Sequence, residues 1–219
     1  MKIVCPSFSW LNDKTPDGLA ILERIARAGR TAYLSEPKGE DADFVRRLIQ
    51  RGHESVLEHA ILSVTIICDR GVSHEEVRHR IASYTQESTR FCNYAGNRLG
   101  GEIAYIDLSG GIEHDPVVSK LPREQIDAIL IEWMQACEDA ERHYMRMIAL
   151  GATPQIARSV LNHSTKTAVT TTMNMREWRH FFKLRHAPDA HPQMREITDI
   201  MLPRSKTSCP SSLMTSNRR

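Results

Sequence analysis

The sequence predicts an α+β fold in a single domain, with long helices packed on a small, mostly antiparallel sheet. Residues 123–150 carry apolar side chains at three- and four-residue steps, which is the period of one long helix. Runs rich in β-branched residues at 60–68 and 166–172 predict strands, and helical patterns do not alternate strictly with them. The length of 219 residues suits one domain with a substantial core.

The first part of the chain predicts a short strand and two amphipathic helices. Ile3 and Val4 begin the strand. Apolar residues at helical spacing predict a helix over 16–29, which Gly29 is expected to end. A second helix is predicted over 41–50, because its apolar residues line one face and a glycine follows shortly after.

The next stretch leads into the most polar part of the sequence. Residues 53–59 are polar and rich in histidine, which predicts a turn or short helix at the entrance of the strand at 60–68. Ser73 and Glu76 have the spacing of a capping box. We therefore expect a helix that starts at Ser73 and runs into the basic triplet 78–80.

The second half of the chain is predicted to be mainly helical. In order, the expected elements are a strand at 102–108, helices at 123–150 and 154–161, a strand at 166–172, and helices at 174–186 and 192–202. Asn174 is the expected N-cap of its helix. On that helix one side is expected to present Arg176, Arg179, His180 and Lys183, and the other to bury Met175, Trp178, Phe182 and Leu184.

Composition excludes several classes of protein. The net charge of +2, from 29 basic and 27 acidic residues, is too balanced for a general nucleic-acid coat. Five cysteines without CxxC spacing argue against a disulfide framework and a zinc site, and favour a reducing cytoplasm. The sequence contains neither a signal peptide nor a membrane-spanning run. We expect a cytoplasmic domain over 1–204 and a polar tail over 205–219.

The segment 78–90 concentrates the groups that bind anions. It holds the triplet Arg78-His79-Arg80, then Ser88 and Arg90, with further hydroxyl and amide side chains between them. Arginine presents a planar fork of donors that matches phosphate, and serine adds a hydroxyl. A charge run is more often a solvated surface. The clustering of hydroxyls with arginines nevertheless favours nucleotide binding.

Metal and nucleophile chemistry receive little support. His53 and His59 are six residues apart, which is not the i, i+4 spacing of a helical zinc site, so no metal is expected. Cys92 lies two residues beyond Arg90, where a thiol could be activated, but such a cysteine more often serves packing. The sequence lacks GxSxG, Walker A and GxGxxG patterns, which disfavours hydrolase, phosphoryl-transfer and Rossmann functions.

The triplet Arg78-His79-Arg80, followed by seven residues and Ser88, resembles the RHR-x7-S pattern of the flavin-dependent thymidylate synthases, the ThyX family. The similarity extends over about 52–193. The resemblance implies a ThyX-like fold and reductive methylation of dUMP to dTMP. It also implies methylenetetrahydrofolate as carbon donor, NADPH as reductant and FAD as hydride carrier. A homotetramer with FAD shared between subunits is implied as well, without a nucleic-acid polymer or membrane as partner.

The resemblance also implies roles for individual residues. Arg185 and Ser88 are the implied catalytic residues, with Arg185 favouring the ionised uracil ring. The residues implied to bind FAD are Ser55, Arg78, His79, Arg80, Gln86, Asn174, Arg176 and His180. Those implied to bind dUMP are Glu75, Glu76, Val77, Arg78, Gln86, Glu87, Ser88, Thr89, Arg90, Arg158 and Arg185.

Three positions depart from the commoner family pattern. Glu75 stands where Gln is frequent, Thr85-Gln86 where Asn-Glu is frequent, and Phe91 where Tyr is frequent. Glu75 is the most consequential, because a carboxylate repels a nearby phosphate. These departures affect the expected contacts more than the expected activity.

The main alternative is a non-catalytic module that binds a nucleotide or RNA. In that case the same arginines would hold phosphates, and Tyr84 or Trp178 would stack on a base. A purely structural role for these side chains would leave their clustering unexplained.

Overall fold

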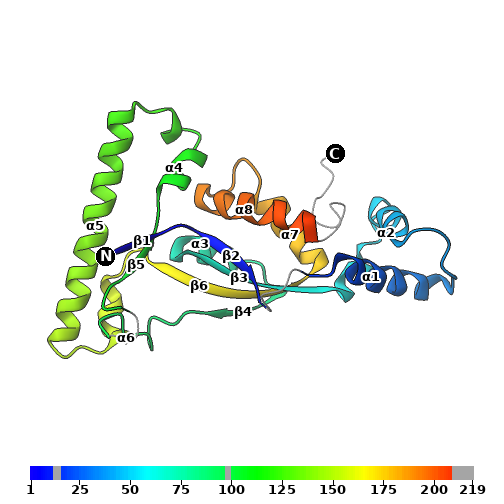
Figure 1. The fold of residues 1–219 in the computed structure, drawn as a ribbon, viewed down its shortest axis with the longest axis horizontal. Helices are drawn as coiled ribbons and strands as arrows, with labels where there is room; N and C mark the ends of the chain where they lie inside the picture. The colour runs from blue at the N-terminus through cyan, green and yellow to red at the C-terminus, as the bar shows by residue number, and fades with distance from the viewer. Residues whose placement is uncertain (12–15, 97–99, 209–219) are drawn as a thin grey trace.

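The computed structural model describes residues 1–11, 16–96 and 100–208. Its centre is a four-stranded antiparallel sheet in the order β2-β3-β6-β4 (Figure 1). A separate two-stranded sheet pairs β1 and β5 in parallel. The α+β class with a mostly antiparallel sheet is thus confirmed. The strands are β1 Lys2–Val4, β2 Ser7–Trp10, β3 Ile61–Asp69, β4 Ala82–Gln86, β5 Ala104–Ile106 and β6 Lys166–Asn174.

Helices surround one side and both ends of the central sheet. In Figure 1, α7 and α8 lie along one side of the long strands, α5 stands at one end, and α1 and α2 lie at the other. The helices are α1 Gly18–Tyr33, α2 Asp41–Gln50, α3 Arg70–Glu76, α4 Ser109–His114, α5 Arg123–Ala149, α6 Pro154–Ala157, α7 Met175–Arg185 and α8 Pro192–Ser208. Short 3₁₀ helices are η1 Glu54–His59, η3 Val118–Lys120 and η4 Arg158–Val160.

Strands β3 and β6 alternate between an apolar and a polar face, as expected for an antiparallel sheet with one side covered. The apolar face joins α1, α7 and α8 in the main core. On the other face, hydroxyl pairs bridge the strands. The hydroxyl oxygens of Ser63 and Thr172 lie 2.8 Å apart, and those of Thr65 and Thr170 lie 2.9 Å apart. A smaller core forms where α5 meets β5, around the buried Tyr105 and Tyr144.

Gly29 does not end the first helix, contrary to the sequence prediction. Helix α1 continues to Tyr33 and ends where Leu34 adopts a left-handed conformation with φ of 46°. A Cβ atom on Gly29 would lie 2.7 Å from Leu48 Cδ1 of α2. Glycine therefore serves the close approach of two helices at this position rather than a helix stop.

The prediction that the basic triplet is helical is also wrong. Helix α3 is capped by Asp69, whose Oδ1 accepts from the Val72 N–H at 2.7 Å, and it ends at Glu76. Ser73 lies inside that helix and donates to the Arg70 carbonyl at 2.9 Å. The chain after the triplet pairs with β6 as strand β4. This pairing with a strand about 90 residues away overrides the local capping pattern.

Two expectations about the last helices need correction. On α7, Arg179 is buried with 5% of its surface exposed, whereas Leu184 is exposed and Phe181 is fully buried. Helix α8 continues through Ser208, and Ser205 is buried, so the expected tail does not begin at 205. The rest of that segment lies outside the described residues. Within the described part of the chain, no helix is long and apolar enough to cross a membrane.

Candidate active site

His79 is the buried centre of a hydrogen-bonded group between β4 and α7. Its Nδ1 lies 2.8 Å from Glu177 Oε1, and Arg185 Nε donates to its Nε2 at 3.1 Å. Because Nε2 must accept from a permanent cation, the proton lies on Nδ1 and is donated to Glu177. Burial lowers the pKa of His79, and the charge of Arg185 lowers it further. The imidazole is therefore neutral and has both nitrogens engaged.

Helix α7 places the partners of His79 on one side. Asn174 caps the helix as predicted, with its Oδ1 accepting from the Glu177 N–H at 2.9 Å. Glu177 and Arg185 are eight residues apart, about 2.2 turns, so they lie on the same side of the helix roughly 80° apart, and both contact His79. The local capping interaction thus fixes the register that brings Glu177 to His79.

Arg185 is held by α3 as well as by His79. One of its terminal nitrogens forms an ion pair with the Glu75 carboxylate, and the other donates to the Glu75 carbonyl at 2.7 Å. Only 15% of the Arg185 side chain is exposed. The guanidinium is thus fixed in position before any ligand binds.

A polar cavity of about 460 Å³ lies beside this group. Arg176 donates to Glu58 at 2.6 Å, and Arg179 lies 3.6 Å from Glu54. The cavity wall therefore contains pairs of oppositely charged side chains. Exposed Lys183 adds a further cation. The cavity is lined by Glu54, Glu58, Ile81, Asn174, Arg176, Glu177, Arg179, His180 and Lys183.

Several residues implied to bind FAD lie at or near this cavity. Asn174, Arg176 and His180 line it, and Ser55 is exposed on η1 between two of its acidic residues. Arg78 and Arg80 are exposed on either side of buried His79. A turn at Val77 and Arg78, followed by chain without regular secondary structure, places the three residues of the triplet in different surroundings.

Three residues here, His79, Glu177 and His180, bring potential metal-ligand atoms within 4.8 Å of one another. Both ring nitrogens of His79 are already hydrogen-bonded, and the Arg185 cation is adjacent. A metal ion would have to displace these bonds against electrostatic repulsion. The geometry favours a hydrogen-bond network over a metal centre.

Glu76 and Gln86 face the protein interior with their side chains. Thr171 donates its hydroxyl to Glu76 Oε1, and burial raises the pKa of Glu76 to about 7. Gln86 Nε2 donates to Ser73 Oγ at 2.9 Å. The Tyr84 hydroxyl lies 2.8 Å from the Glu76 carbonyl and 2.7 Å from the His79 carbonyl. These groups support the segment, whereas the side chain of Val77 is exposed.

The other implied substrate residues lie beyond the far end of β4. Thr89 is buried, and Arg158 donates to its Oγ1 at 3.3 Å. Arg90 and Arg158 are exposed, and among the described residues the Ser88 hydroxyl accepts only from the nearby Arg90 N–H, at 3.3 Å. Glu87 is bonded to Lys166 Nζ at 2.6 Å and to the Tyr94 hydroxyl at 3.0 Å.

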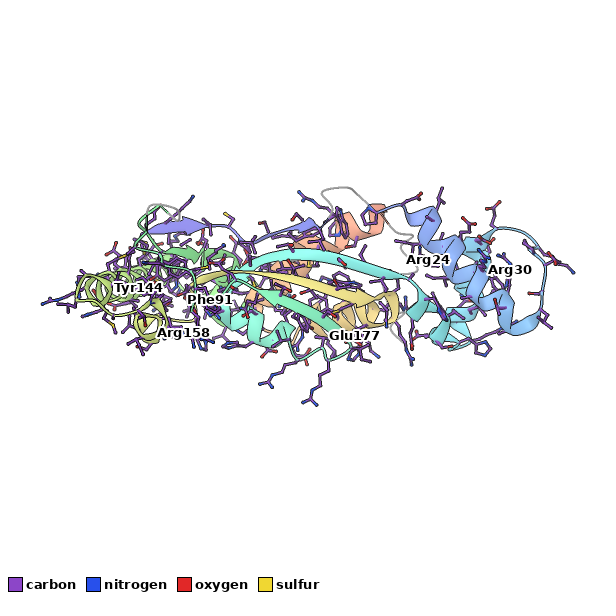
Figure 2. The ribbon with its side chains drawn as sticks, turned by 90° about the horizontal axis from the view of Figure 1, so that it is seen from below. Arg24, Arg30, Phe91, Tyr144, Arg158 and Glu177 are labelled. Atoms are coloured by element: carbon purple, nitrogen blue, oxygen red, sulfur yellow. The ribbon has the colours of Figure 1, made fainter. Side chains whose placement is uncertain are left out.

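The predicted site residues thus form two groups, one around His79, which precedes β4 in the chain, and one in the residues that follow β4. Figure 2 shows Phe91 and Arg158 near each other toward the α5 end, and Glu177 farther along the sheet toward α1. Strand β4 runs between the two groups in the chain, and Gln86 at its second end bonds to Ser73 of α3, the helix that carries Glu75. We call the groups the near end (Glu75, His79, Glu177, Arg185 and the cavity) and the far end (Glu87 to Arg90 with Arg158).

The family model described as thymidylate synthase complementing protein matches residues 11–211. This chain belongs to that family, the family of the flavin-dependent thymidylate synthases. The flavin-dependent thymidylate synthase of Mycobacteroides abscessus is 31% identical over 95% of this chain and 83% of its own length. That of Thermococcus kodakarensis is 35% identical over 71% of this chain, and the match spans 58% of its length.

A solved structure supports the fold of this ThyX-family chain. The UMP/dUMP methylase PolB from Streptomyces cacaoi, bound with 5-Br dUMP, has a TM-score of 0.74 and 23% identity. The match covers 97% of this chain and 95% of PolB. The family resemblance carried by the triplet and Ser88 is confirmed, and the individual residue roles stay predictions.

The structure of this family member adds residues that the sequence analysis did not assign. Glu177 is the buried partner of His79, and Lys166 and Tyr94 fix Glu87. Glu177 is three residues after Asn174, which is the position of a capping-box glutamate. That spacing could have drawn attention to it. Lys166 is 79 residues and Tyr94 seven residues from Glu87, and no sequence pattern links either of them to Glu87.

Proposed function

We propose that the protein is a flavin-dependent thymidylate synthase that converts dUMP to dTMP by reductive methylation. Methylenetetrahydrofolate is the proposed carbon donor and NADPH the proposed reductant. The observation that carries the proposal is the guanidinium of Arg185, held rigidly by His79 and Glu75 beside a polar cavity in a chain of this family.

The donor set at the near end fits FAD. Arg176, Lys183 and the exposed Arg78 and Arg80 provide cations for a pyrophosphate, and His180 adds a further polar group. Glu58 already pairs with Arg176, so it orients that cation before the cofactor binds. FAD, when bound, supplies the hydride chemistry.

The residues of this chain would bind dUMP and adjust its charge. Arg90 and Arg158 are exposed cations next to Ser88, a set that suits the phosphate. Arg185 places a fixed positive charge where the uracil ring develops negative charge, which makes C5 a better nucleophile. This activation requires no protein nucleophile.

We also propose a cytoplasmic homotetramer in which subunits share the site. Among the described residues, no hydrogen bond or ion pair joins Ser88, Arg90 or Arg158 to the group around Arg185. Pairing the near end of one subunit with the far end of another would unite them. Analytical ultracentrifugation is expected to give about four times the 24.9 kDa subunit mass, and a monomer would contradict the shared site.

The deciding experiment measures dTMP formation by the purified protein. With FAD, NADPH, methylenetetrahydrofolate and dUMP present we expect dTMP, and omission of any one should abolish it. Oxidised flavin should give the purified protein a yellow colour. A colourless protein that makes no dTMP but shifts RNA would instead identify a binding module.

A further inference from the structure

Glu75 is the acidic group in direct contact with Arg185. It lies in the last turn of α3, and its carboxylate forms an ion pair with the guanidinium across 110 residues of sequence. The Glu75 side chain is 42% exposed, whereas that of Arg185 is 15% exposed. The ion pair therefore has a solvent-facing side where a ligand can approach.

The hydrogen-bond inventory of Arg185 shows how much of it remains for a ligand. A guanidinium has five N–H groups. Three are directed to His79 Nε2, the Glu75 carboxylate and the Glu75 carbonyl. In the described part of the chain two N–H groups remain. Glu75 therefore takes up two of the directions in which Arg185 could bind an anion.

Charge matters as much as geometry in this contact. A carboxylate in contact with a guanidinium offsets most of the positive field that the guanidinium exerts on a third group nearby. His79 is neutral, so it adds no positive charge to replace what Glu75 offsets. No other acidic side chain has a contact with Arg185 among the described residues. The charge of this arginine is thus controlled by one residue.

We propose that Glu75 is a positioning residue that competes with the nucleotide for Arg185. In the ligand-free protein it neutralises and orients the guanidinium. When an anionic pyrimidine nucleotide binds, the carboxylate yields to it, so the full charge of Arg185 acts only on the bound substrate. The proposal rests on the proposed function and adds a determinant of nucleotide affinity that acts through Arg185.

The test compares E75Q and E75D with the wild type, all loaded with FAD. Glutamine keeps an acceptor oxygen for Arg185 and removes the charge, whereas aspartate keeps the charge. The control is D43N, which removes the same charge from an exposed pair with Arg46 on α2. Calorimetry gives the Kd of dUMP at low and high salt, and steady-state assays give KM and kcat.

We expect E75Q to bind dUMP roughly fivefold more tightly than the wild type at low salt, with KM lowered in parallel. The gain should shrink toward unity at about 1 M salt, because screening weakens the Glu75–Arg185 attraction with which the nucleotide competes. E75D and D43N should not tighten binding. A merely structural role would change stability without this salt-dependent gain in affinity.

Two results would overturn the inference. One is an E75Q protein that is folded, as shown by its thermal transition and bound flavin, yet binds dUMP no more tightly than the wild type. The other is a gain of equal size in D43N. If the wild type itself fails to bind dUMP, the proposed function is wrong rather than the role of Glu75.

Discussion

The two ends of β4 differ in how their polar groups are satisfied. At the near end, His79, Glu177 and Arg185 bond to partners 98 to 110 residues away, and most of them are buried. At the far end, Ser88 bonds to its neighbour Arg90, and the arginines are exposed. The near end is therefore organised before ligands bind. At the far end, Glu87 and Thr89 have partners within the protein, whereas the exposed Arg90 and the Ser88 hydroxyl are left to be fixed by a ligand.

Arg185→Ala tests the near end most severely. We expect dTMP formation to fall roughly 10²- to 10³-fold, because the preorganised charge that is proposed to act on the uracil ring is lost. The bound flavin should be retained, since the cavity residues Arg176 and Lys183 are unchanged. Turnover assays with flavin absorbance measure both quantities.

Arg142→Ala is a suitable control for that variant. Arg142 is an exposed arginine on α5 that pairs with Asp139 one turn away. It should keep the wild-type rate within a factor of two. Full turnover by Arg185→Ala would contradict the role of the near end, whereas loss of flavin would show that Arg185 supports the cavity instead.

Glu76→Gln sharpens the comparison by removing a buried titrating carboxyl group next to Glu75 of the near end. Burial raises the pKa of Glu76 from 4.5 to about 7, so the folded state binds more protons than the unfolded state between these values. Its contribution to stability is present at low pH and is lost as the pH rises through about 7. As the pH rises through this window, the free energy of unfolding of the wild type should therefore fall by about 3 kcal/mol more than that of Glu76→Gln.

Urea unfolding of both proteins at pH 5, 6, 7 and 8 measures this difference. Glu196, whose pKa burial also raises to about 7, is present in both proteins and cancels in the comparison. Parallel pH profiles for the two proteins would show that Glu76 does not titrate in this range.

Arg90→Ala probes the far end, where we expect an effect on binding and little on stability. Loss of one phosphate contact should weaken dUMP binding about tenfold, and the salt dependence of binding should decrease. The free energy of unfolding should change by less than about 0.5 kcal/mol, because Arg90 is exposed. Calorimetry measures the Kd of dUMP, and urea unfolding measures the free energy of unfolding. Destabilisation without weaker binding would mean that the far end is structural.

The same contrast explains what could be predicted from the sequence. Helix α2, the long helix α5 and the Asn174 cap depend on local spacing, and the structure bears them out. The prediction of a helix over the triplet 78–80 is wrong, because the chain leaves α3 in a turn there and continues into β4, whose partner β6 lies far along the chain. The candidate site residues could be named from the family resemblance. The bond from Glu177 to His79 depends on tertiary packing, which local spacing does not encode.

Cys92→Ser is expected to have the smallest effect. Cys92 is half-buried at the edge of the smaller core, and its N–H donates to the Ser88 carbonyl at 2.9 Å. Serine keeps that backbone bond, and the proposed mechanism uses no protein nucleophile. The rate of dTMP formation should therefore stay within a factor of two. A loss of more than tenfold with flavin retained would point to covalent catalysis at the far end, and mass spectrometry of the protein trapped with dUMP would show the adduct.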